Sequence, residues 1–304
     1  EQDLDEDPAL DRAYLDFLAS TASAGLEGLR IVLDCANGSV SRLAPALFSR
    51  LGAEVIATGC SPDGRNINLD CGSLHIEGLR QRVLAEGAAC GAAFDGDADR
   101  CILVSASGRV LDGDHSLLVS GRDLHARGAL GADRPAIVAT VMSNLGLERA
   151  LAASGIALIR TAVGDKYVLE EMVRRSLPLG GEQSGHVIFR EFSTTGDGMM
   201  TALRVLDAAR RAGRPLDELV SGFEIYPQRL VNVRFQRKRP LEELPSVQEC
   251  IRAAETHFGE RGRVLVRFSG TEPLARVMVE GPDPAHVETH ARRIARAIEE
   301  ALSA

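Results

Sequence analysis

The chain has 304 residues, and 35 Lys and Arg against 43 Asp and Glu give a formal net charge of −8. An acidic balance argues against a nucleic-acid scaffold, which needs a basic face, although a few local arginines can still bind one phosphate. No apolar run approaches the ~18 residues that cross a bilayer, so no membrane partner is expected. The length predicts two or three domains.

The six cysteines form no C-x-x-C pair, which argues against a zinc site. Because they are not clustered, they fit a reducing compartment such as the cytoplasm, where most serve as small buried hydrophobes. These cysteines are Cys35, Cys60, Cys71, Cys90, Cys101 and Cys250.

Strands alternate with helices through the first part of the chain. Asp7 and Pro8 form an N-cap and a first helical position, which predicts a linker helix within residues 1–20. An α/β domain at 21–108 is then expected. Its predicted elements are strand 29–33, helix 41–51, strand 54–58, a helix within 72–86, strand 91–94 and a hairpin of 101–104 with 109–111.

A second α/β domain is predicted at 109–225, and it ends after Gly213 and Pro215 close a long helix. Its predicted elements are a helix from 112 to about 127, strand 136–140, helix 143–154, strand 157–161, helix 166–175 and helix 198–212.

The last domain, 226–304, has a different pattern. Val231, Val233 and Phe235 alternate with polar residues, as expected for a half-buried strand. Two further strands of this kind and two helices, about 246–258 and 284–302, give the order strand–helix–strand–strand–helix. The predicted fold class is therefore α/β, with two consecutive α/β mixed-sheet domains followed by a small α+β C-terminal domain.

Three carboxylates alternate in a short loop after the strand 91–94. Asp95, Asp97 and Asp99 would repel one another by about 1 to 4 kcal/mol for each pair at ~4 Å, so a cation between them explains the cluster better. Oxygen ligands favour Mg²⁺ or Ca²⁺. An EF-hand would need glycine at Arg100 and glutamate at Ala106, and a phosphatase D-x-D-x-T loop would need threonine or valine at Asp99. Of these three patterns of metal-binding loop, only D-G-D-x-D-R matches residues 95–100.

A glycine-rich segment at 180–186 carries groups suited to a sugar. Glu182 and Ser184 are two residues apart and point the same way if the loop is extended, as vicinal hydroxyls require. His186 is a candidate proton carrier because its ordinary pKa lies near neutrality. A glycine turn with incidental polar groups remains the alternative.

A third segment follows a predicted strand near the C-terminus and suits a phosphate. Arg267 offers a planar fork for phosphate oxygens, and Arg276 adds charge nearby. Ser269 and Thr271 offer hydroxyl donors, and Gly270 lets a backbone N–H approach an anion. The alternative is a turn between strands with a surface arginine. The sequence has no Walker A loop and no G-x-G-x-x-G motif.

In this order, the three segments resemble the α-D-phosphohexomutase superfamily from end to end. Within it, the segments 33–38, 66–68, 140–146 and 164–168, together with Gln183, are most similar to the phosphoglucosamine mutase branch. The resemblance implies interconversion of glucosamine 6-phosphate and glucosamine 1-phosphate, through a phosphoserine and a bisphosphorylated intermediate.

The resemblance also implies site roles. Asp95, Asp97 and Asp99 would hold Mg²⁺, and Arg100 would contact the phosphate on the phosphoserine. The sugar hydroxyls would be held by Glu182 and Ser184, and His186 would be the general base. The clamp on the phosphate that does not react would comprise Arg267, Ser269, Gly270, Thr271 and Arg276.

One part of the family pattern has no counterpart here. The phosphoserine of the superfamily lies in an S-H-N-P-type motif of an N-terminal domain, and this sequence contains no such motif. We therefore expect a chain that lacks that domain, is inactive alone and has the domain as a partner. Two alternatives stay open: a phosphomannomutase/phosphoglucomutase, and a non-catalytic module that binds a phosphorylated hexose or hexosamine. A homodimer is compatible with the sequence, which does not fix the oligomeric state.

Overall fold

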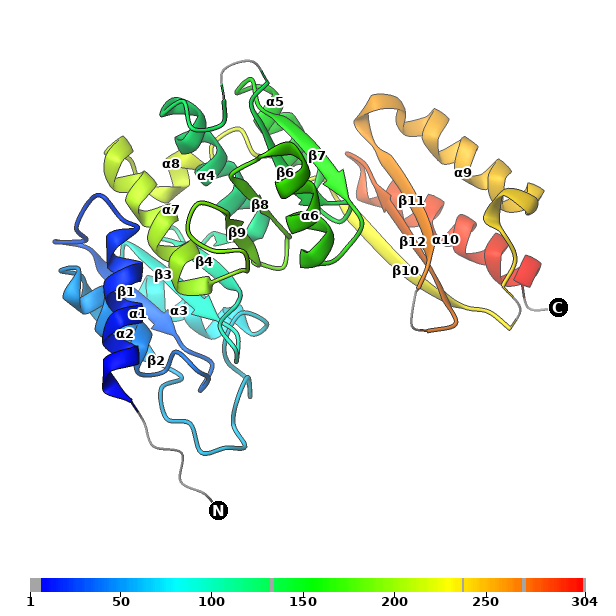
Figure 1. Cartoon of the computed structure of the whole chain (residues 1–304). Helices are drawn as coiled ribbons and strands as arrows, with labels where there is room; N and C mark the ends of the chain where they lie inside the picture. The colour runs from blue at the N-terminus through cyan, green and yellow to red at the C-terminus, as the bar shows by residue number, and fades with distance from the viewer. Residues whose placement is uncertain (1–6, 132–133, 237, 270–271, 303–304) are drawn as a thin grey trace. The chain divides into compact units, whose positions relative to one another are not determined.

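The computed structural model describes residues 7–131, 134–236, 238–269 and 272–302. The chain forms two compact units (Figure 1). The first unit comprises Glu1–Ser143 and Leu147–Phe223, and the second comprises Asn144–Gly146 and Glu224–Ala304.

The first sheet of the first unit is mixed and has the strand order β2-β1-β3-β4-β5. Strand β1 pairs in parallel with β2 and β3, whereas β4 returns antiparallel to β3 and leads into β5. Strands β3 and β4 are buried along their whole length, as the apolar runs predict. The strands are β1 Arg30–Asp34, β2 Glu54–Thr58, β3 Cys90–Phe94, β4 Cys101–Ser105 and β5 Val110–Leu111.

Three helices accompany this sheet, and their ends follow from the local sequence. The N-cap Asp7 accepts a hydrogen bond from the Ala9 N–H, and Pro8 occupies the first turn of α1. Gly87 ends α3 in the left-handed conformation, with φ of 57°. The helices are α1 Pro8–Ser20, α2 Leu43–Arg50 and α3 Ile76–Glu86.

The second sheet of this unit is also mixed, with the order β7-β6-β8-β9. Strand β6 is parallel to β7 and β8, and β9 is antiparallel to β8. The strands are β6 Ala136–Thr140, β7 Ala157–Thr161, β8 Leu179–Gly181 and β9 Val187–Phe189. The helices are α4 Gly113–Ala126, α5 Leu145–Ala152, α6 Asp165–Arg175, α7 Gly198–Ala212 and α8 Leu216–Leu219.

Helix α7 joins the two sheets into one unit. It contacts β3 and β4 of the first sheet, β9 of the second sheet, and helix α4. Its first eleven residues, Gly198–Ala208, are all buried. One apolar core therefore extends across both sheets, from Ile31 and Leu33 to Ile137 and Leu179.

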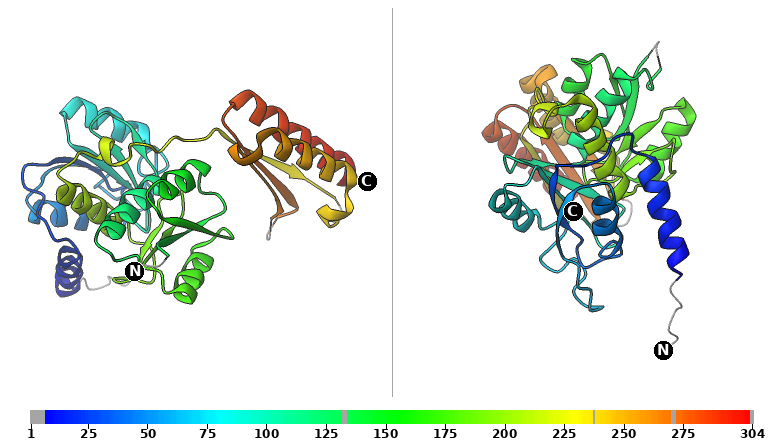
Figure 2. Two further views of the ribbon diagram at one scale, coloured as in Figure 1. Left: turned by 90° about the horizontal axis from the view of Figure 1, so that it is seen from above. Right: turned by 90° about the vertical axis from the view of Figure 1, so that its left-hand side faces the viewer.

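The second unit is a three-stranded antiparallel sheet, β10-β12-β11, with two long helices. Figure 2 shows both helices on one face of this sheet, where their apolar stripes meet the alternating valines of the strands. The elements are β10 Gln228–Arg234, α9 Pro245–Phe258, β11 Arg263–Phe268, β12 Leu274–Glu280 and α10 Pro284–Leu302, with short 3-10 turns at Leu241–Glu243 and Gly259–Arg261.

The predicted fold class is confirmed, since two mixed α/β sheets precede a small α+β unit. The predicted bounds of β2, β6, β7, α1, α7 and α10 coincide with the observed ones. Strands β8 and β9 and helix α8 were not predicted, because three or four residues are too few to display a period. Among the described residues, no helix has the length and apolar character needed to span a bilayer.

Candidate functional site

The aspartate loop, residues 95–100, connects two adjacent antiparallel strands, β3 and β4. Ala98 takes up the left-handed conformation, with φ of 60°, and its N–H donates to the Asp95 carbonyl at 3.1 Å. The Arg100 N–H donates to Asp95 Oδ1, also at 3.1 Å. A non-glycine residue at positive φ is strained, and such strain is found most often where a loop clamps a ligand.

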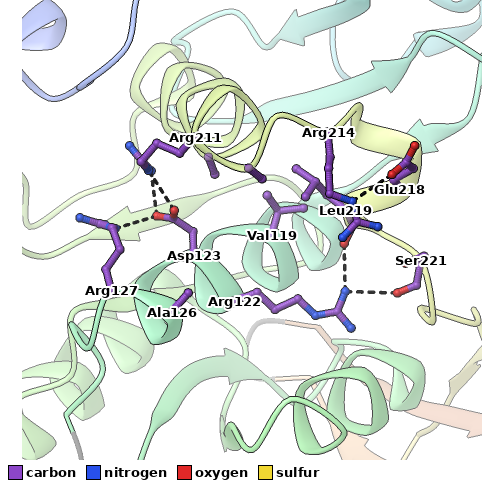
Figure 3. A pocket seen from close by; sticks show the side chains of 12 residues that line it. Val119, Arg122, Asp123, Ala126, Arg127, Arg211, Arg214, Glu218, Leu219 and Ser221 are labelled. Carbon is purple, nitrogen blue, oxygen red and sulfur yellow. Dashed lines mark hydrogen bonds and ion pairs between the residues drawn. The ribbon is translucent and has the colours of Figure 1, made fainter.

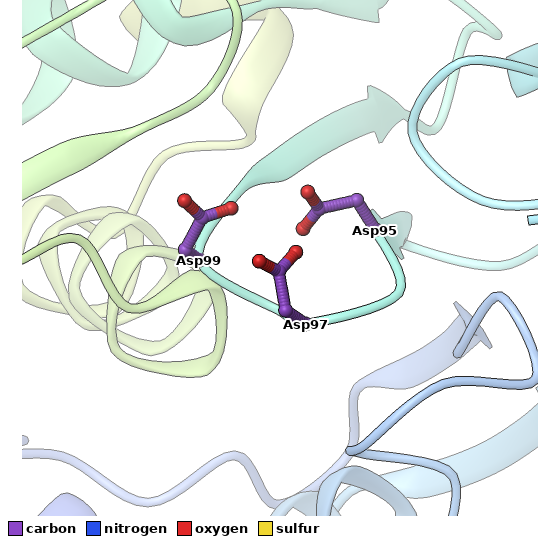
Figure 4. A group of neighbouring side chains, drawn as sticks. All are labelled: Asp95, Asp97 and Asp99. Carbon is purple, nitrogen blue, oxygen red and sulfur yellow. The ribbon is translucent and has the colours of Figure 1, made fainter. Parts of the chain in front are cut away.

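The three carboxylates of this loop point toward one another, and one oxygen from each lies within 4.8 Å of the others (Figure 4). Asp95 is buried, and burial, followed by the charge of Asp99, raises the pKa of Asp95 to about 6. Oδ1 of Asp99 is buried and accepts no hydrogen bond from the described residues. Converging oxygens, one of them unsatisfied, are the donor set that Mg²⁺ prefers.

Arg100 closes the loop on its other side. Its Nε lies 3.8 Å from Asp95 Oδ2 and 3.7 Å from Asp99 Oδ1, which is ion-pair distance without a hydrogen bond. These distances are too long for hydrogen bonds, so the two carboxylates do not fix the Arg100 guanidinium by hydrogen bonding.

Helix α7 begins against the aspartate loop. The Gly198 N–H, at its first position, donates to the Ala98 carbonyl at 2.8 Å. The N-cap Asp197 accepts hydrogen bonds from the Met200 N–H at 2.9 Å and from the Tyr14 hydroxyl at 2.7 Å, and burial raises the pKa of Asp197. Sequence reasoning missed this support, although an aspartate before a helix is a recognisable cap.

The glycine-rich segment 180–186, called the sugar loop after its predicted ligand, is tied directly to the aspartate loop. It links β8 to β9, and Arg100 and His186 form an antiparallel bridge. The Cys101 N–H donates to the Gly185 carbonyl at 3.1 Å. Gly185 has φ of 99°, and a Cβ there would lie 2.6 Å from the Cys101 carbonyl oxygen, so this close approach requires glycine.

His186 is buried, with only 4% of its surface exposed. Its Nε2 accepts a hydrogen bond from the Gly196 N–H at 3.2 Å and lies 3.6 Å from Asp99 Oδ2. Accepting at Nε2 places the proton of the neutral ring at Nδ1, which is buried and has no partner among the described residues. The ring therefore packs directly beside a carboxylate of the aspartate loop.

Two cavities of the first unit contain the predicted side chains. Asp97 and Asp99 line one of about 440 Å³, together with Tyr14 and Gly196. Glu182 and Ser184 line another of about 330 Å³. The Glu182 carboxylate accepts a hydrogen bond from the Gly164 N–H at 3.1 Å, which fixes one oxygen, whereas Ser184 is exposed. The first unit therefore has a cluster of carboxylates that could hold a cation and, separately, a pocket with polar side chains.

The phosphate segment belongs to the second unit. Arg267 lies directly opposite Arg276 in the pairing of β11 with β12, and burial and the charge of Arg276 lower the pKa of Arg267. The Ser269 N–H donates a hydrogen bond to the Leu274 carbonyl at 2.7 Å. Gly270 and Thr271 lie outside the described residues.

Two basic residues that sequence reasoning missed lie beside Arg267. Lys238 and Arg239 line the same cavity of about 470 Å³. The Lys238 ammonium lies 5.1 Å from the centre of the Phe268 ring, within the range of a cation–π contact. The only signal for them in the sequence is the run of three basic residues at 237–239. Position 237 lies outside the described residues.

Three models of one family match the chain in succession. The model for phosphoglucomutase/phosphomannomutase, alpha/beta/alpha domain II, matches residues 12–108, that for domain III matches 112–226, and that for the C-terminal domain matches 230–297. The chain belongs to the phosphoglucomutase/phosphomannomutase family. The resemblance drawn from the three loops is thereby confirmed, and the domains present are II, III and IV.

Curated members of this family are similar over nearly the whole chain. A phosphoglucosamine mutase of Solibacter usitatus is 59% identical over 96% of this chain and 65% of its own length. Another, from Myxococcus xanthus, is 51% identical over 95% of this chain and 63% of its own. The chain thus spans less than two thirds of these relatives.

Solved family members share the fold. N-acetylphosphoglucosamine mutase of Aspergillus fumigatus, in complex with GlcNAc-6P and magnesium, has a TM-score of 0.78 at 21% identity, over 96% of this chain and 66% of that chain. A phosphoglucomutase/phosphomannomutase family protein of Burkholderia thailandensis has a TM-score of 0.77 at 23% identity, over 96% and 64% respectively.

Proposed function

We propose that the chain provides the metal-, sugar- and phosphate-binding domains of a phosphoglucosamine mutase, which interconverts glucosamine 6-phosphate and glucosamine 1-phosphate. The names and high identity of the curated relatives support this choice over other phosphohexomutases. We further propose domain ranges of 21–108, 109–225 and 226–304. The free thiols of all six cysteines favour the cytoplasm as the compartment.

The proposed reaction needs a phosphoserine, which we assign to a further domain that acts with this chain. The serine phosphate passes to O1 of glucosamine 6-phosphate, which leaves a serine hydroxyl and a 1,6-bisphosphate. After the sugar turns over, the phosphate at O6 passes back to the serine. Each step breaks one P–O bond and forms another, so phosphate and protons balance across the cycle.

The residues of this chain take separate parts in that cycle. Asp95, Asp97 and Asp99 would hold Mg²⁺, which supplies positive charge beside the phosphoryl group when bound. Arg100, whose contacts to the carboxylates are long, would turn toward the serine phosphate. In the pocket lined by Glu182 and Ser184, these two side chains would accept from and donate to the sugar hydroxyls.

The packing of His186 supports a positioning role beside its proposed role as general base. Its ring lies against Asp99 and is held by the Gly196 N–H, so it limits where this carboxylate of the proposed cation site can lie. A base must have its lone pair free, and in this conformation the Nε2 lone pair is engaged. Proton transfer through His186 would therefore require the Gly196 contact to open.

In the second unit, Arg267 and Arg276 would bind the phosphate that does not react, together with Ser269 and with Gly270 and Thr271. The pair of directly opposite arginines, of which Arg276 contacts Glu272 at 3.5 Å, supports this assignment. Because either phosphate of the bisphosphorylated intermediate must fit between these residues, they would recognise the phosphate group rather than the sugar.

The convergence of three carboxylates on a loop bridged to the sugar loop carries the proposal. We would test it by assaying the chain together with the phosphoserine domain of a family member. Conversion of glucosamine 6-phosphate should require both parts, and Asp97→Asn should reduce kcat by more than 100-fold, roughly the scale of losing a charge-stabilising group.

The same assay separates the other candidates. A higher kcat/KM with mannose 6-phosphate or glucose 6-phosphate than with glucosamine 6-phosphate would favour a phosphomannomutase/phosphoglucomutase. Tight binding of glucosamine 6-phosphate without turnover, even with the phosphoserine domain present, would indicate a binding module. Turnover by this chain alone at the rate of the two-part enzyme would refute the requirement for a second domain.

A further inference from the structure

A cavity of about 540 Å³ lies in the first unit, between helices α4, α7 and α8 (Figure 3). Its volume falls within the range of small-molecule sites. Four arginines line it: Arg122, Arg127, Arg211 and Arg214. We call this cavity the arginine pocket.

The arginines of the pocket outnumber its carboxylates. Asp123 and Glu218 are the two acidic residues that line it. Asp123 is shared, because it accepts from Arg127 at 3.1 Å and from Arg211 at 2.8 Å. Glu218 pairs with Arg214 at 2.9 Å. Arg211 also pairs with Asp207, which is buried and lies outside the lining. Among the lining residues themselves, four arginines face two carboxylates.

Arg122 carries that excess most clearly. It donates to the carbonyl oxygens of Leu219 at 2.9 Å and Ser221 at 3.2 Å, and to the Ser154 hydroxyl at 3.0 Å. In the described part of the chain, none of its partners is a carboxylate. Burial and the charge of Arg214 lower the pKa of Arg122, as expected for a cation without a counter-ion. Figure 3 shows its side chain extending toward α8.

Apart from Ser221, the rest of the lining is apolar. Val119 and Ala126 come from α4, Ala208 and Ala212 from α7, and Leu219 from α8. A pocket with apolar walls and guanidinium groups suits a ligand that joins an apolar body to an anion. Arginine forks match the oxygens of phosphate in particular, because two parallel hydrogen bonds can form at once.

The arginine pocket is separate from the proposed active site. None of its lining residues lines the cavities of the aspartate loop or the sugar loop. Helix α7 starts against the aspartate loop at Gly198, and Arg211 lies thirteen residues further on, a rise of about 20 Å. Helix α4 likewise starts at the sugar loop, where the Gly113 N–H donates to the Gln183 carbonyl at 3.0 Å.

We propose that the arginine pocket binds a small organic phosphate with an apolar body, at a second site remote from the metal and sugar loops. Two of the three helices that line it, α4 and α7, are the helices whose first residues support those loops. A ligand here would thus contact the far ends of the elements that position the active site.

The test uses phenyl phosphate as the probe, with inorganic phosphate for comparison, titrated into the chain and followed by NMR and calorimetry. Phenyl phosphate should bind with a Kd below about 1 mM, and inorganic phosphate at least about tenfold more weakly, since it lacks the apolar body. Shifted resonances should include Ala126 and Ala212. Equal affinities for the two probes, or no shift at these alanines, would overturn the proposal.

A matched pair of variants at Ala212, which is exposed at the end of α7, tests the charge. Ala212→Glu and Ala212→Gln add side chains of nearly equal size, but only glutamate opposes an anion. Binding should be at least about tenfold weaker in Ala212→Glu than in Ala212→Gln. Equal effects would show that positive charge plays no part. Read from the resonances of Ala126 and Ala212, binding of phenyl phosphate should be unchanged in Asp97→Asn and Arg267→Gln, and loss of these shifts in either variant would assign the probe to the other sites.

Discussion

Arg267 and Arg276 lie directly opposite each other on the antiparallel strands β11 and β12. Like charges at opposed positions of a sheet destabilise it, typically by about 0.2–1 kcal/mol. Among the described residues, Arg276 pairs with Glu272 at 3.5 Å, and its buried Nε–H donates to none of them. The sheet thus retains a repulsion that a bound phosphate would relieve.

This pair predicts opposite effects of Arg267→Gln with and without phosphate. In phosphate-free buffer the variant should raise the free energy of unfolding of the second unit by about 0.2–1 kcal/mol. Added phosphate should then stabilise the wild type more than the variant. Thermal unfolding with increasing phosphate measures both effects. Arg229→Gln is the matched control, because Arg229 of β10 already pairs with Glu288 at 2.8 Å, and its phosphate response should equal that of the wild type.

The aspartate loop predicts a similar reversal for Mg²⁺. Without the metal, Asp97→Asn should stabilise the first unit by about 1 kcal/mol, because one of three mutually repelling charges is removed. With Mg²⁺, the wild type should gain stability and the variant should bind at least about tenfold more weakly. Calorimetry and thermal unfolding in EDTA and in MgCl₂ measure these changes. Glu255→Gln, an exposed change in α9, should alter neither, and an equal Mg²⁺ response in all three proteins would disprove the site.

Most of the fold could be predicted because long elements carry strong periodic patterns. The apolar stripe of α10 and the alternating valines of β11 and β12 gave both element type and approximate bounds. Helix α7 shows the limit. Its bounds were predicted, but its burial between strands of both sheets was not, because tertiary packing does not appear in local pattern.

For the candidate site, the alternation of three carboxylates in a short loop after a strand was enough to predict Asp95, Asp97 and Asp99 as metal ligands. The bridge from Arg100 to His186 joins residues far apart in the chain, and no local pattern indicates such a contact. The same holds for Gly196, whose N–H holds the His186 ring: a glycine in a polar loop gives no sign of its partner.

Gly196 predicts a sharp steric effect. A Cβ at this position would lie 2.4 Å from His186 Nε2 and 2.5 Å from its Cδ2, too close for the ring to stay in place. Gly196→Ala should therefore destabilise the first unit by about 1–3 kcal/mol and weaken Mg²⁺ binding through Asp99. The control is Gly78→Ala in α3, where a Cβ meets open space. That change should stabilise by about 0.5–1 kcal/mol, and matched effects of the two variants would contradict the packing of His186.

A histidine cluster in the second unit predicts a dependence of stability on pH. The ring of His257 in α9 lies 4.6 Å from that of His286 and 5.0 Å from that of His290, measured between ring centres, and both of these lie in α10. Burial, then the charges of His257, Arg293 and His286, lower the pKa of His290 below its ordinary value of 6.5.

Because the pKa of His290 is lower in the folded state, the unfolded state binds the proton more tightly. The stability of the second unit should therefore be complete above pH 6.5 and should fall as the pH drops from 6.5 toward the depressed folded value. Thermal unfolding between about pH 5 and 8 measures this slope. His290→Gln should flatten it, whatever its effect on stability at pH 8, while His75→Gln, an exposed change in the first unit, should leave it intact. If the dependence of stability on pH is unchanged in His290→Gln, His290 does not cause it.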